Sequence, residues 1–440
     1  MAPHIEAIPS DPDLPRAVDV AVIGGGIVGV SAAYFLARKG ASVALVEKGE
    51  IAGEQSARNM GWVRKLGRDL REMPLMLEAA RLWAQLNDIT GEETGFRATG
   101  ITYFAESEDE VDQQLRWLDA AAPFQLDVKR LSGSEAMALA PRSTRRFVGA
   151  LHSPSDGMAE PAVATVALAK AARRAGVKLF TRCAARVIDM QGGRIAGLFT
   201  ERGHLACHKV VLAGGGWSTL FLRNLGVRLP QVKVLSQILR TAPVVGGPPG
   251  CGRGRGFSYR HRRDGGYNIS FSSYPVYVTP DCIRFFADFL PMAKVEGALQ
   301  RLRVGRQLFD ELMMRRCWGA DDITPFERER ACQLDPTPRE IAKAQRRFDI
   351  FPALRDAPVV EAWGGLIDMT PDAIPVISGV SSHPGLFLST GYSGHGFGLG
   401  PGAGRLTAEI VAGESPCVDP SSFAFHRFNA GRADYRPSGL

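Results

Sequence analysis

The first clear hydrophobic pattern in this chain of 440 residues is a short apolar run that ends in glycines. Residues 19–23 read Asp-Val-Ala-Val-Ile, and a mostly apolar stretch, 30–40, follows the glycine-rich turn. A second apolar run, 41–46, ends at Glu47. Short apolar runs bounded by glycines are typical of buried strands, and the longer stretch between them favours a helix. The segment 19–47 is therefore predicted to fold as strand, turn, helix and strand.

Helical and strand-like patterns then alternate through the first half of the chain. The segments with apolar residues at helical spacing are 73–88, 108–120, 132–139 and 161–175. The segments with the alternation or the short apolar runs of strands are 97–105, 177–180, 183–200 and 205–212. The last of these strands ends in the glycine run 214–216, where the backbone can approach a bound ligand closely.

The chain changes character between residues 229 and 290. Aromatic, alternating segments such as 266–270 and 283–288 predict an antiparallel sheet in this region. The following stretch, 294–316, predicts a helix. A proline-rich and polar stretch, 324–340, predicts a connection on the surface.

The C-terminal part returns to short apolar runs and a second glycine loop. Strands are predicted at 359–366, 374–377 and 386–388. The glycine loop 391–398 follows and opens a predicted helix at 399–411. Since a glycine loop that opens a helix occurs near both ends of the chain, we expect both ends to build one nucleotide-binding domain.

The first glycine loop has the spacing Gly-x-Gly-x-x-Gly, and each glycine has a mechanical role. Gly24 allows the tight turn, Gly26 lets the backbone approach a pyrophosphate, and Gly29 lets the helix pack close to the strand. The helix N-terminus offers free N–H groups to the phosphates. Glu47, at the end of the second strand, can accept hydrogen bonds from ribose hydroxyls. The pattern predicts a dinucleotide site, and we expect the loop 48–64 to lie along the cofactor.

Composition narrows the class of protein. Hydrophobic content of 45% and charged content of 22% are typical of a globular chain, and 440 residues suffice for two domains. The seven cysteines are scattered, odd in number and form no Cys-x-x-Cys. This usage suits a reducing cytoplasm and argues against disulfides, a zinc site or an iron–sulfur cluster, so no metal is predicted. The N-terminus does not resemble a secretory signal.

Two other classes of function can be weighed from charge and hydropathy. The net charge is +7, with basic clusters at 253–255, 260–263 and 346–347. Such residues could bind nucleic acid, but no nucleic-acid-binding module is recognisable, so we favour a solvated surface or the steering of an anionic substrate. The weakly charged stretch 18–37 could suggest a membrane span, but its glycine turn would break the helix, so no transmembrane segment is predicted.

Four blocks carry a resemblance to a known family. They are Val20–Glu47, Ala213–Ser218, Trp363–Ile377 and Gly391–Gly404, and they span almost the whole chain. Together they resemble the D-amino-acid oxidase, glycine oxidase and sarcosine oxidase superfamily of FAD-dependent oxidoreductases. The stretch Gly53–Asn59 also resembles bacterial D-amino-acid dehydrogenases and L-amino-acid deaminases.

The resemblance implies an α/β fold with antiparallel β structure. It implies a discontinuous, Rossmann-like FAD-binding domain of the glutathione-reductase type, into which a mixed-sheet substrate domain is inserted. The FAD-binding domain is expected to comprise 15–95, 150–225 and 358–418, and the substrate domain 96–149 and 226–357. Residues 1–14 and 419–440 are expected to be terminal arms.

By resemblance the cofactor is FAD. The residues expected to surround it are Gly24, Gly26, Ile27, Gly29, Glu47, Lys48, Ser56, Arg58, Asn59, Val187, Gly214, Gly215, Trp217, Gly394, His395, Gly396, Phe397 and Gly398. Val187 would place its backbone near the adenine, and the 391–398 loop would lie beside the isoalloxazine. Relatives that bind flavin covalently carry a cysteine where this chain has Gly365. Non-covalent FAD is therefore predicted.

The implied reaction oxidises a C–N single bond to an imine, which needs a clamp for the substrate carboxylate more than acid–base groups. An arginine fork, often with a tyrosine, suits a carboxylate. The candidates are Arg64, Arg260, Tyr259, Tyr267 and Tyr274, each with a structural alternative as surface arginine or core tyrosine. Arg64 is favoured because it follows the cofactor-side loop. For His395 a contact with flavin or substrate and a structural role stay open, and Trp62 either walls the pocket or packs in the core.

Several alternatives stay open at this stage. The substrate is a free amino acid or a secondary amine such as an N-methyl amino acid, a cyclic imino acid or an opine. The chain could also be a flavin subunit that needs a partner, or a domain of a nucleic-acid-modifying enzyme. The electron acceptor is oxygen, a quinone or a dye. Association into a homo- or hetero-oligomer is undecided, and the expected location is the cytoplasm, with contact to the inner membrane surface left open.

Overall fold

The computed structural model describes residues 3–270, 274–296 and 300–428. Its first sheet has six strands in the order β20-β21-β12-β1-β2-β8. β20 runs antiparallel at the edge, and the other strands are parallel to their neighbours. The strands are β1 (Val20–Ile23), β2 (Val43–Val46), β8 (Lys178–Phe180), β12 (Lys209–Leu212), β20 (Val376–Gly379) and β21 (Leu386–Thr390). Strands from both ends of the chain therefore meet in one sheet, as the two glycine loops suggested.

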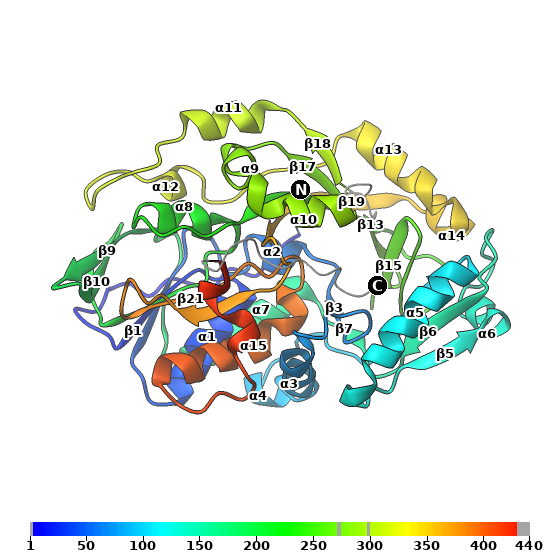
Figure 1. The fold of residues 1–440 in the computed structure, drawn as a ribbon, viewed down its shortest axis with the longest axis horizontal. Helices are drawn as coiled ribbons and strands as arrows, with labels where there is room; N and C mark the ends of the chain where they lie inside the picture. The colour runs from blue at the N-terminus through cyan, green and yellow to red at the C-terminus, as the bar shows by residue number, and fades with distance from the viewer. Residues whose placement is uncertain (1–2, 271–273, 297–299, 429–440) are drawn as a thin grey trace.

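Helices cover one face of this sheet. α1 (Ile27–Arg38) packs against α15 (Gly396–Ala412) and α7 (Pro161–Arg174), and Figure 1 shows these helices together below the sheet. The approach of α1 to α15 is close, since a Cβ on Gly404 would lie 2.2 Å from Cβ of Ser31. The opposite face is covered by the antiparallel strands β9 (Ala185–Gln191), β10 (Arg194–Thr200) and β11 (Gly203–Ala206), together with α8 (Ser218–Arg223).

The second large sheet is mixed and has eight strands in the order β19-β13-β16-β15-β14-β4-β6-β5. Its neighbours pair antiparallel except β14 and β4, which are parallel. The longest ladder joins β13 to β19, from Val232 opposite Met369 to Thr241 opposite Val359. The strands are β4 (Ile101–Ala105), β5 (Lys129–Ser132), β6 (Gly149–Ser153), β13 (Val232–Thr241), β14 (Cys251–Gly254), β15 (Phe257–His261), β16 (Tyr267–Ser270) and β19 (Val359–Met369).

These two sheets form the predicted architecture, a Rossmann-like unit with an inserted mixed sheet. The predicted boundary at residue 358 falls at the start of β19, which pairs with β13 of the larger sheet. The domain boundaries themselves stay a prediction. The remaining elements are β3 (Trp62–Val63), β7 (Gly157–Met158), β17 (Tyr274–Tyr277), β18 (Gln300–Arg303), α2 (Gln55–Arg58), α3 (Met73–Ala84), α4 (Leu86–Thr90), α5 (Glu108–Ala120), α6 (Gly133–Ala138), α9 (Pro280–Arg284), α10 (Phe286–Glu296), α11 (Arg306–Met313), α12 (Pro325–Arg328), α13 (Pro338–Arg346) and α14 (Pro352–Arg355).

Three sequence predictions in the inserted part were wrong. Residues 283–288, predicted as a strand, lie in α9, α10 and the residue between them, because Pro280 opens a helix at its first position; Ile283 and Phe286 are exposed and only Phe285 between them is buried. The predicted helix 294–316 is interrupted by β18. The predicted surface connection 324–340 contains α12, which has a capping box and a buried Phe326.

The described helices include none with the length and apolar character that a membrane crossing requires.

Candidate active site

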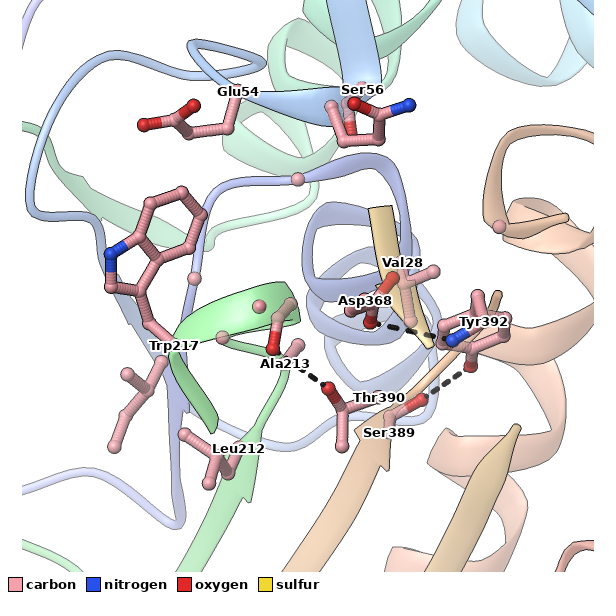
Figure 2. Close-up of a pocket in the computed structure, with 18 of the residues that line it drawn as sticks. Val28, Glu54, Ser56, Leu212, Ala213, Trp217, Asp368, Ser389, Thr390 and Tyr392 are labelled. Atoms are coloured by element: carbon pink, nitrogen blue, oxygen red, sulfur yellow. Dashed lines mark hydrogen bonds between the residues drawn. The ribbon is translucent and has the colours of Figure 1, made fainter. Parts of the chain in front are cut away.

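A large cavity lies at the carboxyl ends of β1, β12 and β21, where parallel α/β sheets bind ligands. It comprises about 1160 Å³ of space not filled by atoms, part of it open to solvent. Figure 2 shows Trp217 toward one end and Asp368 and Tyr392 toward the other. The predicted cofactor residues that line it are Gly24, Gly26, Ile27, Glu47, Lys48, Ser56, Asn59, Gly214, Gly215, Trp217, Gly394, Gly396 and Phe397.

The turn before α1 is built by close backbone contacts. Gly24 has φ +112°, and a Cβ there would lie 2.3 Å from the carbonyl oxygen of Ala213. A Cβ on Gly29 would lie 2.1 Å from the carbonyl oxygen of Gly24. Gly29 therefore does not line the cavity but sets how closely α1 approaches the turn.

Two polar side chains hold the N-terminus of α1. The Glu47 carboxylate accepts hydrogen bonds from the amides of Gly25 (2.6 Å) and Gly49 (2.7 Å). The Ser56 hydroxyl accepts from the amide of Ile27 at 2.9 Å. The Ile27 amide is the first of the helix, and the Gly25 amide lies just before it; amides at this end of a helix form an anion site when a phosphate approaches.

The Trp217 end of the cavity carries a positive charge. Lys48 Nζ lies 3.9 Å from the centre of the Trp217 ring and donates to the carbonyl of Glu329 at 2.9 Å. It also lies 3.6 Å from the Glu54 carboxylate. This end therefore combines a flat aromatic face with a partly paired cation, an arrangement that can hold a planar, electron-rich ring.

The opposite end is formed by the second glycine loop, which is tied to β19 by Asp368. The Asp368 carboxylate accepts from the amides of Gly391 (2.8 Å) and Tyr392 (3.3 Å), and its carbonyl accepts from the amide of Ser393 at 2.8 Å. Burial raises the pKa of Asp368 to about 6. The hydroxyl of Tyr392 hydrogen-bonds to Ser389 at 2.9 Å. The loop is thus held by a buried acid instead of by close contact between backbone atoms.

The cavity fits an FAD molecule in both shape and chemistry. Its length joins two glycine loops, each of which opens a helix, and the carboxamide oxygen of Gln55 on its wall is buried without a hydrogen-bond partner in the described structure. A buried acceptor of this kind suits a ligand donor such as a ring N–H. A side chain at Gly365 would start 2.3 Å from that same oxygen, so the wall has no room for a tethering cysteine without rearrangement.

Beside the second glycine loop, Arg64 follows directly after β3 and lies near a second set of polar groups. The N-terminal turn of α15 packs on β3, since a Cβ on Gly398 would lie 3.2 Å from the carbonyl oxygen of Trp62. The Arg64 guanidinium lies 5.9 Å from the centre of the Tyr103 ring, and that of Arg253 lies 5.4 Å from it. The Tyr103 hydroxyl is buried without a hydrogen-bond partner in the described residues. Arg64 donates to the carbonyl of Leu66 at 2.6 Å, and no carboxylate of the described residues pairs with it.

His395, at the N-terminal end of α15, turns toward a buried carboxylate. Its Nδ1 lies 3.1 Å from Glu72 Oε2, and Arg68 Nη1 lies 3.2 Å from the same oxygen. Glu72 is fully buried and Arg68 is 2% exposed, whereas the His395 side chain is 17% exposed. His395 does not line the large cavity.

Three further predicted cofactor residues lie away from the cavity wall. Arg58 is buried and donates to the carbonyls of Cys332 (2.7 Å) and Gly53 (2.9 Å), which fastens the loop to its surroundings. Gly398 packs on β3. Val187 packs in the core between the smaller sheets, and Ala185 of the same strand lines the cavity instead.

The structure does not bring Tyr259, Tyr267 or Arg260 to either polar region. Tyr259 and Tyr267 are 1% exposed in the core of the larger sheet, and the Tyr267 hydroxyl donates to the carbonyl of Pro248 at 2.9 Å. Arg260 is fully buried and donates to the Ala159 carbonyl at 2.7 Å and to Glu160 at 3.2 Å. These are packing positions: Tyr259 and Tyr267 lie in the hydrophobic core of the larger sheet, and Arg260, on the opposite face of β15 from Tyr259, is held by Ala159 and Glu160. The side chain of Tyr274 lies outside the described part of the structure.

Sequence analysis missed several residues of these sites. Glu72 precedes an apolar helix and reads as an ordinary acidic helix start, and it meets His395 across 323 residues of chain. Tyr103 lies in a strand pattern that predicts burial but not a free hydroxyl. Gln55 and Asp368 lie next to motif residues, and only the glycine loops beside them could have drawn attention to them. In the described ranges no group of at least three His, Cys, Asp or Glu side chains is arranged to hold a metal ion.

Comparisons with known proteins agree with this geometry. The family model described as FAD dependent oxidoreductase (DAO) matches residues 19–410. A glycine oxidase from Pseudomonas aeruginosa is 27% identical over 421 residues, which cover 92% of this chain and 98% of that protein. The sarcosine oxidase beta subunit from an Arthrobacter species is 24% identical, with 97% of this chain and 95% of that subunit covered. The solved L-amino acid deaminase from Proteus myxofaciens, in complex with anthranilate, is 31% identical with a TM-score of 0.93, and 97% of each chain is covered.

Proposed function

Because this chain belongs to the family of FAD-dependent oxidoreductases, we propose that it oxidises the C–N bond of a free amino acid to an imine. Water then converts the imine to a keto acid and ammonia. FAD, when bound, supplies the acceptor for the hydride that leaves the substrate's α-carbon. The chain's own task is to hold the carboxylate and the amine so that this carbon faces the flavin.

One observation carries the choice of a carboxylate-bearing amine. Arg64 lies between the second glycine loop and Tyr103 with no carboxylate partner among the described side chains, and the Tyr103 hydroxyl has no partner either. Arg253 faces the same ring. A buried hydroxyl and a cation left without an anion are costly unless a ligand completes them. An amino-acid carboxylate supplies both acceptors, and we assign it to Arg64 and Tyr103 with Arg253 beside them.

We propose the following roles around the flavin. The α1 amides, released from Ser56, take the pyrophosphate, and Glu47 takes a ribose. Trp217 and Lys48 hold the adenine end, and Gln55 accepts from the flavin ring. Binding is proposed to be non-covalent, and acid denaturation should then release all the yellow colour into the supernatant. Colour retained on the precipitated protein would contradict non-covalent binding.

A secondary amine is the second candidate, because the beta subunit of a sarcosine oxidase is among the relatives that match nearly the full chain. A D-amino acid dehydrogenase from Chromohalobacter salexigens also matches, at 25% identity, so the relatives do not fix the chirality. A free amino acid and an N-substituted one would both present a carboxylate to Arg64. The two candidates differ only in whether the amine is primary or secondary.

The test is anaerobic bleaching of the flavin band by D- and L-amino acids, N-methyl amino acids, cyclic imino acids and opines. We expect a free amino acid to bleach the flavin, and Arg64→Ala to raise the substrate concentration for half-maximal bleaching about 100-fold, since a charged hydrogen bond is lost. Arg97→Ala, which removes an exposed arginine paired with Glu93, is the matched control. A panel in which only secondary amines bleach the flavin, or an Arg64→Ala variant with unchanged half-saturation, would contradict the proposal.

The electron acceptor and the location belong to the same proposal. Readmitting air after bleaching distinguishes oxygen from a quinone or dye as acceptor.

A cytoplasmic location is supported by the seven cysteines, all of which are free thiols. If the protein contacts the membrane surface, the exposed apolar side chains of α9–α11, including Phe286 and Met313, are the surface we expect it to use. Cell fractionation with a low-salt and a high-salt wash tests both statements, and size-exclusion chromatography gives the oligomeric state.

A further inference from the structure

A continuous polar chain connects the Arg64 region to the second glycine loop. The Arg64 carbonyl accepts from Arg68 Nη2 at 3.1 Å, and Arg68 Nη1 lies 3.2 Å from Glu72 Oε2. Glu72 in turn lies 3.1 Å from His395 Nδ1. The side chains of Arg68 and Glu72 are almost completely buried, whereas the His395 side chain keeps some accessible surface.

Glu72 determines which nitrogen of His395 carries the proton. Burial raises the pKa of Glu72, but the charge of Arg68 and the hydrogen bonds from Arg68 and His395 lower it overall, so the carboxylate is ionised and can only accept hydrogen bonds. His395 Nδ1 must then be the donor, and the lone pair of the neutral ring lies on Nε2. Burial lowers the pKa of His395, and the positive charges of Arg68 and Arg64 act in the same direction. The Glu72 carboxylate opposes this shift without reversing it. The imidazole is therefore neutral at pH 7.

The His395 side chain does not cap the helix that it precedes. It occupies the N-cap position of α15, yet its side chain makes no capping hydrogen bond. The side chain does not line the large cavity but faces the network that begins at Arg64. The described residues offer Nδ1 a partner and leave Nε2 without one, and the side chain keeps 17% of its surface exposed, so Nε2 is available to a ligand.

We propose that His395 Nε2 accepts the proton of the substrate ammonium and that Glu72 is the positioning residue that keeps Nε2 free. This rests on the proposed function, since the carboxylate of the amino acid is placed at Arg64. In the step, one N–H bond of the ammonium breaks and its electron pair stays on the substrate nitrogen. A new N–H bond forms at Nε2, and the ring becomes an imidazolium stabilised by Glu72. The neutral amine then has the electron pair that C–N oxidation requires.

The test uses anaerobic stopped-flow bleaching of the FAD-loaded enzyme by the amino acid that the panel identifies. His395→Asn keeps a donor for Glu72 but has no base, and we expect bleaching at pH 7 to slow about 10²–10⁴-fold. The rate should approach the wild-type rate above the pKa of the free ammonium, where the substrate needs no base. Glu72→Gln should slow bleaching less and displace the rising limb of the pH profile. Glu78→Gln, which removes a carboxylate of α3 that also pairs with α15 through Arg405, is the matched control.

A second readout does not depend on turnover. Nitrogen NMR of histidine-labelled protein should show His395 as the neutral Nδ1–H tautomer, identified by its absence in His395→Asn, and Glu72→Gln should lose that tautomer. Wild-type rates in His395→Asn at pH 7, or an equal slowing at every pH, would overturn the inference and leave the proposed function standing. A wild-type flavin that no amino acid bleaches would instead overturn the proposed function and the proton transfer with it.

Discussion

Two glycine loops open two helices onto the same cavity, and they are held in different ways. The first loop, before α1, is fixed by contacts between backbone atoms, with Gly24 against Ala213 and Gly29 against Gly24, and by Glu47, which accepts from the Gly25 amide. The second loop, before α15, is fixed by buried acids, with Asp368 under its amides and Glu72 on His395. Both loops are held by an acid, but the first depends in addition on glycines at which a side chain would meet a backbone oxygen.

This difference predicts different responses to mutation and to pH. Steric contacts between backbone atoms do not change with pH and tolerate no added atom. Buried acids tolerate small changes of shape but respond to protonation and to the loss of a partner. We therefore expect an added side-chain atom to disrupt the first loop, and a change in pH to alter the stability of the second.

The largest effect is expected for Gly29→Ala in the first loop. The new methyl carbon would lie 2.1 Å from the Gly24 carbonyl oxygen, so α1 must move. Although alanine is the better helix former, we expect a loss of about 3 kcal/mol in the free energy of unfolding and no bound FAD. Absorbance at 450 nm relative to 280 nm and chemical denaturation measure the two effects.

The matching change in the second loop sharpens the comparison. Gly398→Ala places its methyl 3.2 Å from the Trp62 carbonyl oxygen, so we expect a cost of about 1 kcal/mol with FAD retained. Gly216→Ala, whose Cβ would meet only Lys233 Cγ at 3.5 Å, is the control on the same cavity. Equal effects of Gly29→Ala and Gly398→Ala would contradict the distinction between the loops.

The second prediction concerns the titration of Asp368. Its pKa is about 6 in the folded chain and near 3.8 when unfolded, so the folded state binds more protons between these values. The free energy of unfolding of the flavin-free protein should therefore fall as pH rises from about 4 to 6, by about 3 kcal/mol relative to Asp368→Asn. Urea denaturation of both proteins across this pH range measures the difference. Parallel stability profiles for the two proteins would show that the second loop is not held by a titrating acid.

A smaller effect is expected at the acid of the first loop. Glu47→Gln replaces an oxygen that accepts from the Gly25 or Gly49 amide by a group that donates, and we expect FAD affinity to fall about 10–100-fold. Titration of apoprotein with FAD, followed by flavin fluorescence, gives the dissociation constant. Glu50→Gln, next to it on the surface and paired with Arg182, should leave the constant unchanged. A similar loss of FAD affinity in both variants would attribute the loss to the change in net charge and not to the hydrogen bonds of Glu47.

The smallest expected effect lies at the far end of the cavity. Lys48→Met keeps the length of the side chain but removes the cation above Trp217, which is worth about 0.5–1 kcal/mol. FAD affinity should therefore fall two- to five-fold, and the loss should shrink at high salt, as measured by the same titration. Trp217→Phe keeps an aromatic face and should show a loss no larger than this. An unchanged affinity in Lys48→Met would remove Lys48 from the proposed cofactor residues.

The parts of the fold that could be predicted from sequence are those set by local pattern. The segment 19–47 has its turn, helix and strands determined by neighbouring residues, and the structure confirms them. Residues 283–288 were wrongly predicted as a strand, because the exposed Ile283 and Phe286 on either side of the buried Phe285 produce a pattern that also fits a strand. Where the apolar positions do not face a core, periodicity carries little information.

The polar sites show the same limit. Arg64 could be singled out because it follows a cofactor-side motif, and it does lie beside the second glycine loop. Tyr259 and Tyr267 have the right chemistry but are turned into the core of the larger sheet. No local sequence pattern marks Glu72 as part of a site, because its partner His395 is distant in the sequence and comes near only in the folded chain.

The distance along the chain between Glu72 and His395 also has a consequence for biosynthesis. The two residues are 323 positions apart, so the ribosome needs on the order of tens of seconds to make the second after the first. During that interval Glu72 can pair with Arg68, which precedes it in the chain, but not with His395. The cavity is also incomplete during that interval, because residues of the second glycine loop form part of its wall. We therefore expect FAD to bind only after this loop has been synthesised and packed against the first sheet.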